Sequence, residues 1–96
     1  MSDNLQDIAN LDIEANLEMG ILGSIILNNE MIDSLEFLKP EHFSYSAHQK
    51  LFKHLKNCIQ NEDKKIGAPT LGTYFKLESS MKDLGGVDHL KRILAS

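Results

Sequence analysis

Apolar residues recur every three or four positions along most of this 96-residue chain. That spacing puts them on one face of an α-helix, which has about 3.6 residues per turn. The alternation of apolar and polar residues that is typical of strands is nowhere sustained, and no Asn-Gly or Asp-Gly hairpin turn occurs. The sequence therefore predicts an all-α fold, a small compact bundle of about five to six helices.

The first helix is predicted over residues 13–27, with Asp12 as its N-cap. Two glycines, Gly20 and Gly23, lie inside it, although each glycine costs a helix about 1 kcal/mol relative to alanine. We expect another helix to approach closely there. Residues 1–11 are predicted to form a flexible lead-in, and residues 12–96 a single helical domain. The apolar positions expected to face the core are Ile13, Leu17, Ile21, Leu22, Ile25 and Ile26.

Further helical segments follow, separated by turn-forming residues. We expect them over about residues 30–38, 46–61, 69–78 and from residue 87 onward. Pro40 ends the first of these, and the turn after it should carry Phe43 into the core. Residues 79–84 are predicted to be a single turn, and Gly85-Gly86 permits a sharp reversal before the last helix.

The segment 46–61 has the clearest helical pattern. Ser46 and Gln49 fit a capping box, in which each side chain would accept a backbone N–H of the first turn. Its lysines share the face opposite the apolar one, at positions Lys50, Lys53 and Lys56. We interpret them as the solvated side of an amphipathic helix. Phosphate contact is the alternative, but no aromatic residue interleaves with them in sequence, so base stacking is not expected.

Charge is distributed unevenly. Residues 1–45 hold nine acids and one base, a net charge of −8, whereas residues 46–96 hold five acids and nine bases, a net charge of +4. The total of −4 argues against general nucleic-acid affinity. If the halves occupy different faces, they would suit head-to-tail neighbours or a charged protein partner; the faces could equally interleave.

The sequence offers no active site. No phosphate-binding loop of the form G-x-x-x-x-G-K-[ST] is present, so we expect no catalytic residue and no bound cofactor in this chain. No apolar run reaches the roughly 20 residues that a membrane span needs. The single cysteine, Cys58, fits a reducing cytoplasm. His54 and Cys58 are four residues apart, but a structural zinc ion usually needs four ligands, so no metal site is predicted.

His48 falls on the apolar face of its helix. A catalytic role would require a nucleophile or carboxylate partner, and none can be inferred from the sequence. We therefore predict a buried histidine that fixes helix packing through a hydrogen bond.

Several segments together resemble the N-terminal domain of bacterial DnaB-like replicative DNA helicases. They are Asn16–Ser24, Leu38–Phe43, Ala47-His48 with Leu51-Phe52, Ile66 with Thr70-Leu71, and Leu84–Leu90. Each motif is weak alone, but their order and spacing are specific. Two positions depart from the family pattern: Gly67 stands where an aspartate is usual, and His89 where a tyrosine is common.

This resemblance implies a non-catalytic collar domain above a hexameric ring of ATPase motors, which supports ring assembly and receives primase during DNA replication. ATP and Mg would belong to the motor domain, which this chain lacks. Implied partners are other helicase protomers, primase and a helicase loader, with DNA contacted by the parent protein and not by this domain. From the matched motif positions we expect Glu14, Glu18 and His89 to contact partners. The alternatives are a stand-alone helical protein-interaction adaptor and a small nucleic-acid binder that uses Lys50, Lys53 and Lys56, which we call the lysine stripe.

Overall fold

The computed structural model describes the backbone of residues 2–96 and the side chains of residues 14–96. Within these residues the chain forms six α-helices, one 3-10 turn and one π-helical turn, and it forms no strand. The elements are α1 Ser2–Leu27, α2 Met31–Ser34, η1 Pro40–His42, α3 Ser46–Lys56, η2 Asn57–Asn61, α4 Ala68–Leu77, α5 Ser79–Asp83 and α6 Val87–Ala95. The predicted all-α fold is confirmed.

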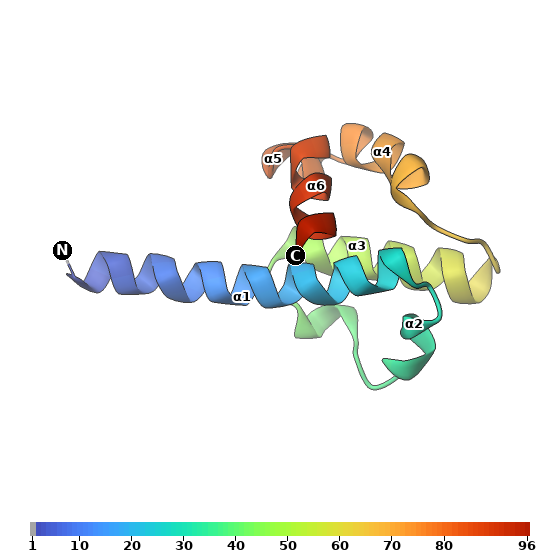
Figure 1. Ribbon diagram of the computed structural model, residues 1–96, viewed down its shortest axis with the longest axis horizontal. Helices are drawn as coiled ribbons and strands as arrows, with labels where there is room; N and C mark the ends of the chain where they lie inside the picture. The colour runs from blue at the N-terminus through green and yellow to red at the C-terminus, as the bar shows by residue number, and fades with distance from the viewer. Residues whose placement is uncertain (1) are drawn as a thin grey trace.

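The long helix α1 is the axis of the molecule (Figure 1). Helix α3 packs alongside α1, behind it in this view, and α6 packs against the middle of α1 from above. Helices α4 and α5 lie beyond α6, whereas α2 and the turn η1 lie on the opposite side of α1. Helices α1, α3 and α6 therefore meet at the centre of the domain.

The core is formed by residues from every helix. Its fully buried members include Leu22, Ile25, Ile32, Leu51, Phe52, Leu55, Leu71, Phe75, Met81 and Ile93. Phe43 is buried as predicted and stacks at a tilt on Phe52, with 5.1 Å between ring centroids. Burying side chains of this size contributes about 1.5–3 kcal/mol each, which is how so short a chain can fold.

Helix α1 differs from its prediction in extent and in face. It begins at Ser2 and so includes most of the segment expected as a lead-in; the side chains of residues 1–13, and with them the Asp12 cap, lie outside the described residues. Leu17 was expected to face the core but is 65 % exposed, whereas Glu18 is buried. Glu18 therefore points into the core, where the apolar spacing predicted that Leu17 would point.

Two other local predictions need correction. The helix expected over residues 30–38 is only the four-residue α2, followed by a turn. The Ser46 capping box does not form, because Tyr45 is the N-cap of α3 and no side chain caps that end. Instead the Gln49 amide donates a hydrogen bond of 2.6 Å to the carbonyl of Phe43, which fixes the turn that precedes the helix.

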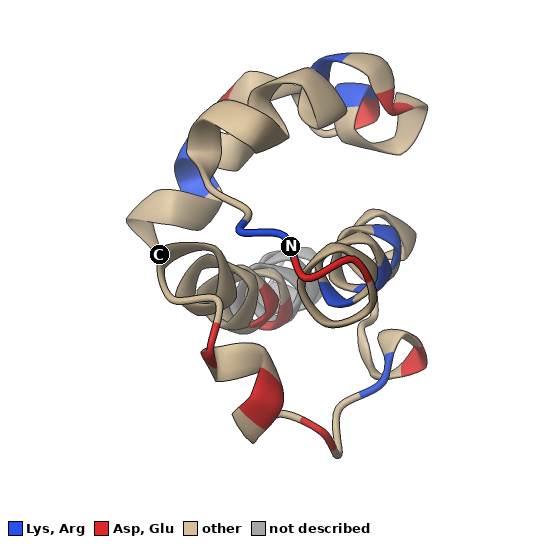
Figure 2. Cartoon of the chain, turned by 90° about the vertical axis from the view of Figure 1, so that its right-hand side faces the viewer, with Lys and Arg blue, Asp and Glu red and all other residues tan. Residues whose placement is uncertain are grey.

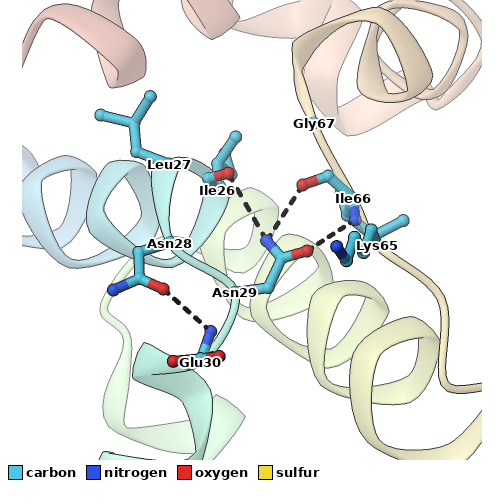
Figure 3. A pocket seen from close by; sticks show the side chains of 8 residues that line it. All are labelled: Ile26, Leu27, Asn28, Asn29, Glu30, Lys65, Ile66 and Gly67. Atoms are coloured by element: carbon cyan, nitrogen blue, oxygen red, sulfur yellow. Dashed lines mark hydrogen bonds between the residues drawn. The ribbon is translucent and has the colours of Figure 1, made fainter.

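The end of α1 is tied to the loop before α4 by Asn29, as Figure 3 shows. Its amide nitrogen donates to the carbonyl of Ile66 at 3.0 Å, and its amide oxygen accepts the Ile66 N–H at 2.8 Å. The same nitrogen also donates to the carbonyl of Ile25 at 2.8 Å. The polar groups in this shallow pocket therefore satisfy one another, which makes it a structural clamp.

Candidate protein interface

A buried chain of polar side chains joins the three central helices. Glu18 of α1, His48 of α3 and His89 of α6 are all buried, and His48 is only 1 % exposed. The His48 Nδ1 atom lies 2.7 Å from Glu18 Oε1, and His48 Nε2 lies 3.0 Å from His89 Nε2. His48 is therefore buried and hydrogen-bonded, as predicted, to side chains of the two neighbouring helices.

The groups at the two ends of this series of hydrogen bonds, Arg92 and Glu18, determine which atom donates in each bond. Arg92 can only donate, and its Nη2 lies 3.2 Å from His89 Nδ1, so that nitrogen is the acceptor. The His89 proton must then sit on Nε2, from which it is donated to His48 Nε2. His48 in turn donates from Nδ1 to Glu18, whose other oxygen accepts the Ser44 N–H at 2.6 Å. All donors and acceptors are paired with both histidines neutral.

The environment of His89 opposes its protonation. Burial, then the nearby His48 and the charge of Arg92, lower the pKa of His89 from 6.5 to about 4. The unfolded chain therefore binds a proton at a higher pH than the folded one. The stability that depends on neutral His89 is fully present above about pH 6.5 and is lost as the pH falls toward 4.

We expect the free energy of unfolding to fall between pH 6.5 and 4, by up to about 1.4 kcal/mol per pH unit from this group. Urea denaturation followed by circular dichroism at a series of pH values measures the slope. The His89→Gln variant should show a flatter profile, whereas His42→Gln, at an exposed histidine, should keep the slope of the original chain. Equal slopes in all three proteins would exclude this role for His89.

The expected partner residues occupy different environments. Glu18 and His89 are brought together through His48, but both are buried. Glu14 lies one turn earlier on α1 and is exposed. Their contact with a partner stays a prediction, and burial favours a role for Glu18 and His89 in positioning the helices over direct contact. Two features of the sequence could have indicated that Glu18 and His48 meet. Glu18 is one helical turn from the core residue Leu22, and His48 falls on an apolar face where a buried histidine needs a hydrogen-bond partner.

Two residues of the lysine stripe, Lys50 and Lys53, line a cleft between α3 and α4 that the sequence did not predict. It measures about 330 Å³ and is lined by Lys50, Lys53, His54, Asn57, Tyr74 and Glu78. The rings of His54 and Tyr74 stack with 4.2 Å between centroids. Aromatic residues therefore do lie beside the lysines, because the tertiary fold brings Tyr74 to α3 from a different helix. We call this cleft the Lys53 cleft.

The Lys53 cleft is positively charged chiefly through Lys53. Lys50 is paired with Glu78 at 3.4 Å, and among the described residues Lys53 has no carboxylate within ion-pair distance. Burial lowers the pKa of His54, an effect that outweighs the opposing influence of Glu62, so this ring is neutral at pH 7. One uncompensated cation thus stands beside a stacked aromatic pair.

An acidic surface lies elsewhere on the molecule. The segment 30–41 holds four acids and one base, a net charge of −3. Figure 2 shows red ribbon on α2 and its flanks, and blue ribbon along α3. Within this segment Phe37 is 72 % exposed, and it is the one aromatic residue among the exposed large hydrophobic side chains of the described part. We call Phe37 with its neighbours Asp33 and Glu36 the Phe37 knob.

A third surface feature is an apolar groove on α1. It measures about 440 Å³ and is lined by Asn16, Leu17, Gly20, Ile21, Ser24, Met31, Leu35 and Ser96. The exposed side chain of Leu17 forms part of its wall.

The described residues contain neither a cluster of potential metal ligands nor a membrane-spanning helix. No group of three or more potential metal ligands gathers among them. Cys58 is buried, and its sulfur lies 3.8 Å from His54 Nε2. None of the helices in the described part is both long and apolar enough to cross a bilayer.

Comparison with known proteins places the chain in a family. The family described as the DnaB-like helicase N-terminal domain matches residues 10–96. Among curated proteins, the replicative DNA helicase DnaB of Rickettsia typhi is 32 % identical over 94 residues, covering 96 % of this chain and 18 % of the relative. That of Rickettsia conorii is 28 % identical over 93 residues, covering 96 % and 19 %. The chain thus spans about a fifth of the length of these relatives. No solved structure matches it.

Proposed function

The chain belongs to the DnaB-like helicase N-terminal domain family, and from that premise we propose that it is the non-catalytic collar domain of a hexameric replicative DNA helicase. In this role it supports assembly of the ring and receives primase during DNA replication in the bacterial cytoplasm. Unwinding of duplex DNA, with its need for ATP and Mg, would belong to the motor domain of the parent protein.

The observation that carries this proposal is the match over residues 10–96, which includes every helix that forms the core. The chemistry of the domain is consistent with it. Its buried histidines and carboxylate are fully paired with one another, so none is poised to act on a substrate. The exposed features are an acidic knob, a basic cleft and an apolar groove, all of which suit protein partners.

Primase is the partner that we would test first, with a helicase loader as a further candidate. The chain would be labelled with nitrogen-15 and titrated with the helicase-binding domain of the cognate primase, while amide shifts are followed by NMR. We expect shifts that cluster on one exposed surface. If Glu14 belongs to that surface, Glu14→Ala should weaken binding without changing the fold, because its side chain is exposed.

Absence of shifts at about 1 mM primase domain would contradict primase reception by this chain, since even a binding free energy of about −4 kcal/mol would be detected there. A folded sample that binds no primase but captures another protein would favour the stand-alone adaptor.

A further inference from the structure

The contact between His48 and His89 holds one proton between two nitrogen atoms. Their Nε2 atoms lie 3.0 Å apart, and the planes of the two rings differ by 8°. A proton on one of these nitrogens makes a hydrogen bond to the other. Protons on both would place two N–H groups head to head. The domain can therefore bind a further proton without separating α3 from α6 only if this contact still holds a single proton afterwards.

The two ends of the buried series carry opposite charges. The carboxylate of Glu18 lies 2.7 Å from His48 Nδ1, and a negative charge at this distance favours the charged form of an imidazole. At the other end the guanidinium of Arg92 lies 3.2 Å from His89 Nδ1 and opposes a charge on that ring. A positive charge on the histidine pair is therefore favoured on His48.

The rings that pack on the pair in the described part supply no competing charge. The ring of Tyr45, at the start of α3, lies 5.4 Å from that of His48, and the ring of Phe75 from α4 lies 6.4 Å from that of His89. Burial, then His48 and then Arg92 lower the pKa of His89 to about 4. His89 is therefore a poor place for the charge to stay, although its Nδ1 atom faces the exposed Arg92.

We propose that His48 and His89 form a proton switch that controls the position of Arg92. A proton from solvent binds Nδ1 of His89, and the proton on Nε2 of His89 passes to Nε2 of His48. Two N–H bonds form and one breaks, so the net uptake is one proton. His48 becomes an imidazolium that donates to both Glu18 and His89, whereas His89 stays neutral as its other tautomer.

The switch releases Arg92 because Nδ1 of His89 changes from an acceptor to a donor. A guanidinium can only donate, so the hydrogen bond between these two side chains is lost. Arg92 is exposed, and its remaining bond is to the carbonyl of Leu84, just before the Gly85-Gly86 reversal. Acidification therefore frees a cation on the surface of α6, while the bond between α3 and α6 is kept with its direction reversed.

Nitrogen-15 spectra of the histidine rings, recorded for the whole chain over a series of pH values, identify the protonated nitrogen of each ring. Above the transition we expect protons on Nδ1 of His48 and on Nε2 of His89. Below it both nitrogens of His48 should be protonated, and the proton of His89 should appear on Nδ1. The two rings should share one midpoint, because a single proton uptake changes both. The Arg92 side chain should show a lower order parameter below that midpoint.

Charge variants at the two ends should move the common midpoint in opposite directions. Glu18→Gln removes the carboxylate that favours the imidazolium and should lower the midpoint by about one pH unit or more. Arg92→Gln removes the opposing cation and should raise the midpoint. Lys91→Gln removes the neighbouring exposed cation of α6 and is the matched control, with an unchanged midpoint. Circular dichroism verifies the fold at each pH, and Arg92→Gln, at an exposed position, keeps the test available if Glu18→Gln does not fold.

The switch would be overturned if His89 took up its second proton before His48 did, if His89 kept the same tautomer throughout, or if the chain unfolded before either ring changed. A midpoint that Arg92→Gln leaves unchanged would overturn the coupling to Arg92. These measurements involve no partner protein, so their failure would leave the proposed collar function standing.

Discussion

Replacing Glu18 by alanine is expected to lower the free energy of unfolding by about 3 kcal/mol, a large share of the roughly 5–15 kcal/mol that holds a small domain together. Its carboxylate accepts hydrogen bonds from His48 Nδ1 and from the Ser44 N–H, at 2.7 and 2.6 Å. Alanine leaves the buried His48 donor without an acceptor, which costs about 1–3 kcal/mol, and the part-buried Ser44 N–H also loses its partner.

Urea denaturation of the variant measures the loss, and Glu14→Ala is the matched control because it removes an exposed acid from the same helix. That control should change stability by less than about 0.5 kcal/mol. Glu18→Gln should be intermediate, since its amide keeps one acceptor but turns an N–H₂ group toward the second donor. The nitrogen-15 shifts of the His48 ring should change as well, because Glu18 fixes its proton on Nδ1. A Glu18→Ala protein as stable as the original would show that the buried network does not hold the domain together.

Periodicity and turn residues together predicted most of the helices, although the one expected over residues 30–38 is only the four-residue α2. The turn that buries Phe43 and the reversal at Gly85-Gly86 are found as expected. Helical structure also ends at residue 61, but its last five residues form the π-helical turn η2 and only Ser46–Lys56 is α-helix. Both of these glycines have positive φ, at 112° and 60°, as the reversal requires. Predictions based on local polar chemistry were less successful, as with the Ser46 capping box, because a cap depends on the path of the chain just before the helix.

The site was harder to predict because its members are distant in sequence. Glu18 and His48 are 30 residues apart, and His48 and His89 are 41 apart, so no spacing rule connects them. The apolar pattern of α1 wrongly predicted that Leu17 is buried. Periodicity alone cannot show that the buried position belongs to the neighbouring acid, Glu18. Likewise, Tyr74 comes beside the lysine stripe only because the fold stacks its ring on His54 of α3.

Gly23→Ala is expected to destabilise the domain by about 2–3 kcal/mol, within the range found when extra atoms are forced into a packed interior. A Cβ atom at Gly23 would lie 2.5 Å from the backbone carbonyl oxygen of Ile93. That oxygen belongs to the rigid helix α6, so the clash cannot be relieved by a side-chain rotation. Helix α6 would have to move away from α1, and the hydrogen bond between His89 and His48 would lengthen with it.

The same substitution at Gly20, Gly20→Ala, is expected to raise the stability of the domain. Apart from the adjoining residues and backbone of α1 itself, no atom lies within 4 Å of a Cβ placed at Gly20, so alanine fits without strain. The substitution should stabilise the domain by up to about 1 kcal/mol, the difference in helix propensity between the two residues. Thermal and urea denaturation of both variants would therefore give shifts of opposite sign. A loss of stability at both positions would mean that the clash with Ile93 is not what makes alanine unfavourable at Gly23. A gain at both would show that α6 does not approach α1 as closely as the position of the Ile93 carbonyl indicates.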